Sequence, residues 1–461
     1  MGHGGKEMST AGDLAGVATG ARRLAVAWLA LGVSALAVAG LFAILLVLAR
    51  TPGLQQVFPA VDFFRTALVV HVDQSVIAWF LAFAGFLWSL LGLKSGGGLG
   101  WSALAVAATG CALIALAPWM GAAAPLMNNY VPVLRHPLFF LALGLFGTGV
   151  LLQAGRFLAS LRPASDAWAP LRVGMSTVAV AVLAAGGTLL WTWGAAQGDW
   201  RGEAYYEYLF WGPGHVLQFA YTQLMLVAWV WLARAHGVRL GLPDRWLAGL
   251  LVVGIAPLAL VPVVLGLYAP DSGDSVLAFT RIMQFGNAVA AVPLGAALLI
   301  GLLRRRPTAA PGGAAFGALV ASLLLFAVGG VLGALIAGVN TVIPAHYHGS
   351  IVGVTLSLMG LTYHLLPTLG FSAPLGRLAT WQPWVYASGQ LLHVSGLAIS
   401  GAMGIQRKTA GSAQVLEGWG QKAAMAVMGL GGLLAVIGGI LFVVVVGRAL
   451  ARPKRSEQPF R

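Results

Sequence analysis

Twelve long apolar segments follow one another along the chain, and short polar stretches separate them. A helix needs about 20 apolar residues to cross a bilayer, and each segment comes close to or exceeds that length. The pattern therefore predicts an all-α polytopic membrane protein, a bundle of twelve transmembrane helices. The predicted spans are residues 24–49, 62–93, 100–117, 137–158, 170–195, 207–234, 246–268, 276–303, 314–338, 342–366, 381–403 and 419–447.

The composition supports this interpretation. Of the 461 residues, 59% are hydrophobic and 9% are charged, whereas a soluble chain carries about 25% charged residues. We expect a single transmembrane domain over residues 1–447 and a short basic cytoplasmic tail over 448–461. The single cysteine, Cys111, excludes intrachain disulfides, cysteine-rich metal clusters and covalent c-type haem attachment.

The basic residues are distributed unevenly between the two sides of the predicted bundle. Of the 27 Lys and Arg residues, 19 lie at the chain ends or in the even-numbered loops, and 8 lie in the other loops. Because cytoplasmic loops are rich in Lys and Arg, this asymmetry predicts that both termini are cytoplasmic. The net charge of +14 thus reflects topology, and no nucleic-acid partner is expected.

Four histidines fall at similar depths in the outer half of the predicted membrane: His71, His215, His346 and His348. A single intramembrane histidine is more often a hydrogen-bonded packing residue than a ligand. Polar groups in lipid are costly, however, and four at one level on three helices favour a shared function. Imidazole is a common ligand of haem iron and copper.

The pair His346 and His348 is the most specific feature. Two residues that are two positions apart on a helix point about 200° apart, since each residue turns the helix by about 100°. The two imidazoles are therefore expected to serve two metals on opposite sides of one helix. That arrangement suits two haems, one of which has an open position for a small gas molecule.

Three stretches carry a family resemblance. They are Arg65-Thr-Ala-Leu-Val-Val-His71, Trp211-Gly-Pro-Gly-His215 and Asn340-Thr-Val-Ile-Pro-Ala-His346-Tyr-His348. They resemble the second, sixth and tenth helices of the catalytic subunit of the haem-copper oxidase superfamily, which includes cytochrome c oxidases and nitric oxide reductases. Among the oxidases the likeness is greatest to the B-type. It covers essentially the whole chain, because the family core also has twelve spans.

The resemblance implies a role for each of these histidines. His71 and His348 would be the axial ligands of a low-spin haem, and His346 would be the proximal ligand of a high-spin haem. His215 would be a ligand of a second, non-haem metal, copper or iron. The basic pair Arg407 and Lys408 would bind haem propionates, and Arg65 and Arg135 are further candidates for that role.

Two departures from the family pattern concern the second metal and the substrate. The family supplies two adjacent histidines from its seventh helix, and here the nearest polar groups are Tyr268, Asp271 and Asp274. Either a carboxylate such as Asp271 completes a different metal site, or the metal is absent. Oxygen reductases of this kind also have a tyrosine one turn after the sixth-helix histidine. That position is Phe219, and Tyr268 could substitute only if it folds inward.

Together these features predict a respiratory terminal reductase in a bacterial or archaeal cytoplasmic membrane. Reduction of NO to N2O is favoured, since it needs no tyrosyl radical, with electrons from a donor subunit that carries cytochrome c or a copper centre. The alternatives are an O2 reductase, a non-redox transporter, and a haem-bearing electron-transfer or sensor subunit. Proton-path candidates are Gln218, Asn287, Glu203 and Glu207, whereas Asn128-Asn129-Tyr130 is interpreted as a turn before the fourth span.

Overall fold

All twelve predicted segments are helical in the computed structural model. It describes residues 19–50, 61–92, 97–122, 124–161, 168–196, 201–305, 313–407, 416 and 418–452. Among these residues, ten helical runs are long and apolar enough to cross a membrane. The other two predicted spans are α13 (Val342–Leu365) and α14 (Arg377–Ala402), of 24 and 26 residues. The prediction of an all-helical polytopic membrane protein is confirmed.

The chain divides into two compact units. The amino-terminal unit comprises Ala18–Val227 and Gly241–Ala297, and the carboxy-terminal unit comprises Met1–Val17, Ala228–Leu240 and Leu298–Arg461. The single domain expected over residues 1–447 stays a prediction. Most of the expected basic tail lies beyond residue 452 and thus outside the described residues.

The amino-terminal unit begins with α1 (Thr19–Arg50). The second span is continuous but changes its helix type, through α2 (Val61–Val72), the π-helical η1 (Asp73–Ala78) and α3 (Trp79–Leu91). The remaining elements are α4 (Gly98–Leu116), η2 (Ala117–Met120), α5 (Pro137–Ser160), α6 (Ala169–Gly194), α7 (Gly202–Ala235), α8 (Asp244–Val253), η3 (Ala256–Leu260), α9 (Val261–Leu267), α10 (Gly273–Gly286) and α11 (Ala288–Leu303). The last turns of α7 and α11 belong to the carboxy-terminal unit.

A short hairpin joins α4 to α5. Its strands are β1 (Pro125–Leu126) and β2 (Val133–Leu134), which pair antiparallel with Pro125 opposite Leu134. Val133 and Leu134 are fully buried. The hairpin therefore anchors its tip, residues 127–132, against the helices, and this tip contributes to the site described below.

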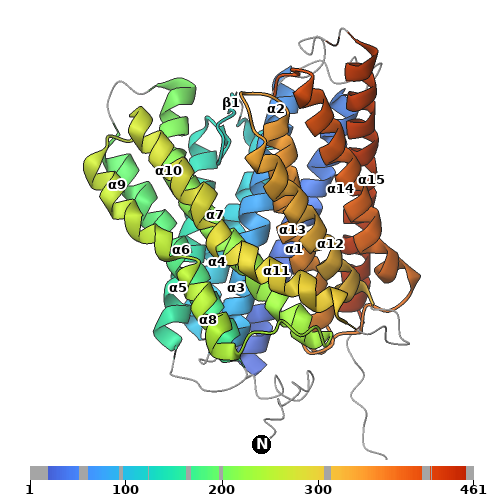
Figure 1. Ribbon diagram of the computed structural model, residues 1–461. Coiled ribbons are helices and arrows are strands. Elements are labelled where there is room, and N and C mark those ends of the chain that lie inside the picture. The colour runs from blue at the N-terminus through green and yellow to red at the C-terminus, as the bar shows by residue number, and fades with distance from the viewer. Residues whose placement is uncertain are drawn as a thin grey trace, which may run out of the picture. The chain divides into compact units, whose positions relative to one another are not determined.

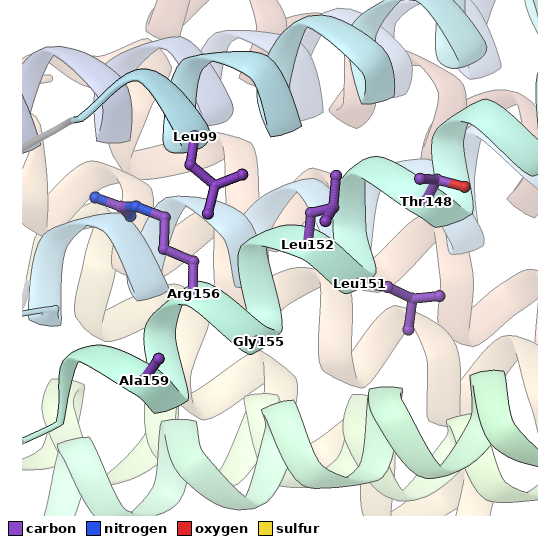
Figure 2. Close-up of a pocket in the computed structure, with 7 residues that line it drawn as sticks. All are labelled: Leu99, Thr148, Leu151, Leu152, Gly155, Arg156 and Ala159. Atoms are coloured by element: carbon purple, nitrogen blue, oxygen red, sulfur yellow. The ribbon is translucent and has the colours of Figure 1, made fainter.

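An open groove of about 460 Å³ runs along α5 in the same unit (Figure 2). Six of its lining residues come from α5 and one, Leu99, from α4, and Arg156 is the only charged residue among them. None of the histidines singled out from the sequence lines it. The groove is thus separate from the candidate site.

The carboxy-terminal unit contains α12 (Ala314–Ala334), α13, α14 and α15 (Trp419–Leu450). Helices α14 and α15 run side by side (Figure 1). Their backbones approach so closely that a Cβ on Gly438 would lie 2.6 Å from Cα of Tyr386. Close approach at small residues is the usual mode of helix association in lipid, and here it fixes α15 against α14.

Candidate functional site

His215 lies on α7 and is 1% exposed. Its Nδ1 lies 2.6 Å from the carbonyl oxygen of Trp211, and its Nε2 lies 2.8 Å from the hydroxyl oxygen of Tyr130. Because a carbonyl oxygen can only accept, Nδ1 carries the proton and Nε2 accepts a hydrogen bond from the phenol. Both ring nitrogens are thus engaged within the amino-terminal unit.

Tyr130 reaches His215 from the tip of the hairpin. Asn128 closes the tip, since its Oδ1 accepts from the backbone N–H groups of Tyr130 at 3.0 Å and Val131 at 2.8 Å. Glu207 on α7 accepts from Asn129, through the backbone N–H at 3.1 Å and through the side-chain amide. Residues 128–130 form a turn, as the sequence predicts, and it is the tip of the hairpin. The structure adds that the side chain of Tyr130 contacts α7, 85 residues further along the chain.

His71 lies at the end of α2, in the amino-terminal unit. Its Nδ1 donates to the carbonyl oxygen of Ala39 on α1, at 2.8 Å. Two residues later the π-helical turn begins with Asp73, which is 0% exposed and has no hydrogen-bond partner for its carboxylate among the described residues. Single π-helical turns are frequent at functional sites, so the local geometry marks this part of the second span.

His346 and His348 point to different neighbours within the carboxy-terminal unit. The Nδ1 of His346 donates to the carbonyl oxygen of Gly329 on α12, at 2.7 Å. The Nδ1 of His348 donates to the carbonyl oxygen of Pro344, at 2.8 Å, and its ring lies 4.8 Å from the ring of His393 on α14. The divergence that the helical spacing predicts is thus present.

Five intramembrane histidines share one hydrogen-bond pattern, in which Nδ1 donates to a backbone carbonyl at 2.6–2.9 Å: His71, His215, His346, His348 and His393. In each ring the lone pair is therefore on Nε2. Metal-ligating histidines usually donate their other nitrogen in this way, which sets the tautomer and the ring orientation. In His71, His346 and His348 this tautomer leaves Nε2 as the atom with which a ring would bind iron, and their predicted roles as haem ligands stay predictions. His136 shows the opposite pattern, since its Nδ1 accepts from the N–H of Leu138 at a helix start.

The other predicted site residues lie elsewhere. Tyr268 directly follows α9 and is 37% exposed, and Asp271 is exposed in the loop before α10. Arg407 is half-buried just after α14, and Lys408 lies outside the described residues. The predicted pairing of His71 with His348 joins the two units and stays a prediction. Across the described residues, no three His, Cys, Asp or Glu side chains are grouped so that they could hold one metal ion.

Comparisons with known proteins agree with these features. Residues 23–441 match the family described as Cytochrome C and Quinol oxidase polypeptide I. An uncharacterized protein of Rickettsia prowazekii, RP382, is 30% identical over 93% of this chain and 96% of its own length. An uncharacterized protein of Aquifex aeolicus is 32% identical over 77% of this chain and 88% of its own. A heme-copper terminal oxidase solved as a dimer superposes with a TM-score of 0.76 at 16% identity, over 96% of this chain and 86% of that one.

Proposed function

This chain belongs to the haem-copper oxidase subunit I family, and on that basis we propose that it is a haem-dependent membrane reductase that converts NO to N2O. The observation that carries the proposal is the arrangement of His346 and His348 on α13. Their Nδ1 atoms donate to Gly329 on α12 and to Pro344 on α13 itself, which leaves the lone pair of each ring on Nε2. A spacing of two residues directs the two side chains about 200° apart around the helix.

In this proposal His71 and His348 hold the low-spin haem, and His346 holds the high-spin haem. The bound haems would supply iron that changes oxidation state and one open coordination position for a gas. The carbonyl partners of the three Nδ1 atoms hold each ring in place and raise the basicity of Nε2. Arg407 and Lys408 would neutralise the haem propionates, since guanidinium and ammonium groups pair strongly with carboxylates.

The proposed reaction consumes two NO, two electrons and two protons, and yields N2O and water. Electrons would come from a donor subunit that carries cytochrome c or a copper centre. With both termini in the cytoplasm, the histidines would lie near the outer surface, on the side where such a donor binds. Gln218 and Asn287 remain candidates for proton transfer, whereas Glu207 is engaged by the hairpin tip.

One feature favours NO over O2. Phe219 occupies the position where the oxygen reductases carry a tyrosine. Four-electron reduction of O2 draws on more local electron donors than the two-electron coupling of NO.

O2 reduction is the second candidate function, and one observation favours it. The phenol of Tyr130 lies 2.8 Å from Nε2 of His215. A tyrosine is therefore present beside this histidine, although it comes from the hairpin and not from α7. If the phenol of Tyr130 serves as the family's tyrosine does, the phenylalanine at position 219 no longer argues against O2 reduction.

The purified full-length chain tests both candidates. We expect two haems per chain by the pyridine haemochrome method, a CO-binding haem after reduction, and consumption of NO faster than O2 with an artificial donor. His346→Ala should abolish CO binding and gas turnover but retain the low-spin spectrum. A protein without a Soret band would contradict every redox function and leave the transporter, and faster O2 consumption would favour the oxidase. Two haems without turnover of either gas would favour the electron-transfer or sensor subunit.

A further inference from the structure

We infer that His215 is not a metal ligand in this chain, and that Tyr130 and His215 form a resident, metal-free hydrogen-bonded pair. The inference deepens the proposed function, because it describes what stands at the position where the family implies a second metal. It rests only on residues of the amino-terminal unit. It differs from the prediction that His215 binds copper or iron, and the experiments below decide between the two.

The ring of His215 has no lone pair left for a metal while Tyr130 is in place. Nδ1 carries a proton, because its partner is the carbonyl oxygen of Trp211 at 2.6 Å. Nε2 accepts from the hydroxyl of Tyr130 at 2.8 Å. A neutral imidazole has one donor and one acceptor nitrogen, so the acceptor cannot bind the phenol and a metal at once.

The surroundings of the ring are filled by aromatic side chains. The ring centroids of Tyr130 and Trp211 lie 4.6 and 4.8 Å from that of His215, and the ring of Phe279 lies at 6.4 Å. A Cβ on Gly214 would collide with the ring of Tyr130. The missing side chain at position 214 therefore makes room for the phenol, and the rings of Trp211 and Phe279 carry no atom that could donate to copper or iron.

One face of α7 is built to receive the hairpin tip. Glu207, Trp211 and His215 are spaced four residues apart, so their side chains follow one another along one face of the helix. Glu207 holds Asn129 through two hydrogen bonds. Trp211 meets the ring of Tyr130 edge-on at 5.6 Å, and its own indole N–H donates to the carbonyl of Val276 at 3.0 Å. Tyr130 is thus held by Glu207 through its neighbour Asn129, and by Trp211 and His215 through its ring and hydroxyl.

In the part of the chain that the structure describes, the side chains that could bind a metal together with His215 are also too few. Cu(II) and iron are held by several N or O donors, and a single imidazole is a weak site. The described residues hold no group of three or more metal-binding side chains. Asp271, which the sequence suggested as a further ligand, lies in an exposed loop.

Metal analysis of the purified full-length chain is the first test. Cells are grown with added copper, iron and zinc, and total metal is compared with haem iron. We expect all iron to be accounted for by haem and no stoichiometric copper or zinc. One non-haem metal per chain that disappears in His215→Ala would overturn the inference.

Thermal stability of Tyr130 and His215 variants is the second test. Tyr130→Phe keeps the ring packing but leaves a buried Nε2 without its donor, so we expect Tm to fall. His215→Phe should lower Tm as well, and the double variant should lower it by less than the sum of the two, since both remove the same hydrogen bond. Additive changes in Tm, or no change of Tm in Tyr130→Phe, would contradict a stabilising hydrogen bond between Tyr130 and His215.

Glu207→Gln, with the exposed Glu203→Gln as the matched control, tests how Tyr130 is positioned. We expect only the first variant to increase proteolytic cleavage within residues 125–134, because only Glu207 accepts from Asn129. Equal cleavage of the two variants would contradict the role of Glu207. Chelators should leave the Tm of the unmodified chain unchanged, and a large fall would indicate a resident metal.

These results are separable from the proposed function. A chain without haem that still shows the non-additive Tyr130 and His215 effects would refute the reductase and keep the pair. A chain with two haems and a third, His215-dependent metal would refute the pair and keep the reductase.

Discussion

A Cβ atom on Gly333 would lie 2.6 Å from Nδ1 of His346. Because Gly333 has no side chain, the imidazole of His346 on α13 occupies the space beside α12. Its Nδ1 donates to the carbonyl of Gly329, one turn before Gly333 on α12. The orientation of His346 is thus set by its neighbour helix as much as by its own.

Gly333→Ala tests this relationship. The added methyl must displace the imidazole, so we expect the CO-binding haem to be reduced or lost while total helix content stays unchanged. The reduced-plus-CO difference spectrum measures the effect. Gly330→Ala is the matched control, because nothing lies within 4 Å of a Cβ at that position. Equal spectra of the two variants would show that α12 does not position His346.

Single histidine variants should separate the two haems. We expect His348→Ala to remove the low-spin spectrum and His346→Ala to remove CO binding. His136→Ala should keep both haems, because Nδ1 of His136 caps the start of α5 by accepting from Leu138. Loss of that cap costs about 0.5–2 kcal/mol of stability. Haem content and low-temperature spectra of the three variants provide the measurement. Loss of both haems in His136→Ala would contradict the assignment of His136 to the helix cap alone.

The contact between α14 and α15 should be sensitive to a single methyl group. Gly438→Ala places a Cβ 2.6 Å from Cα of Tyr386, and the backbone there cannot rotate away. We expect a loss of about 1–3 kcal/mol in stability, as is typical of overpacking. Gly439→Ala, next along the helix, meets nothing within 4 Å and should be neutral. Detergent or thermal unfolding curves compare the two, and equal curves would contradict the close packing.

His236, immediately after the spanning part of α7, should make stability depend on pH. Burial, with smaller contributions from His364 and Arg305, lowers the pKa of His236 to about 4. The unfolded chain keeps a histidine pKa of about 6.5, so below that pH the unfolded state binds more protons. Stability that is present above about pH 6.5 is therefore lost as pH falls toward 4.

The variant His236→Phe checks this pH dependence. The substitution removes the titrating group and keeps a ring beside Phe316, whose centroid lies 5.7 Å from that of His236. We expect a smaller fall of Tm between about pH 6.5 and pH 4.5 than in the unmodified chain. An unchanged slope would assign the pH dependence to other groups.

Much of the architecture could be predicted from the pattern of residues. Twelve helical segments follow from the length and hydropathy of the apolar runs, because lipid leaves a spanning chain few alternatives to a helix. The divergence of His346 and His348 follows from helical geometry alone. Helix boundaries within the spans were less predictable: the π-helical turn at Asp73 and the break between α8 and α9 have no clear signal in the hydrophobic pattern.

The sequence by itself determined the membrane fold, because hydropathy decides which segments can cross lipid. Its motifs also pointed to the family by resemblance, and the haem-ligand roles of the histidines are a prediction from that resemblance. Only the tertiary structure decided which partner each imidazole has. Tyr130 and His215 are 85 residues apart in sequence, and nothing in the local pattern of either marks the other. A long-range hydrogen bond depends on how a hairpin and a helix pack, and that is a property of the folded chain and not of either segment.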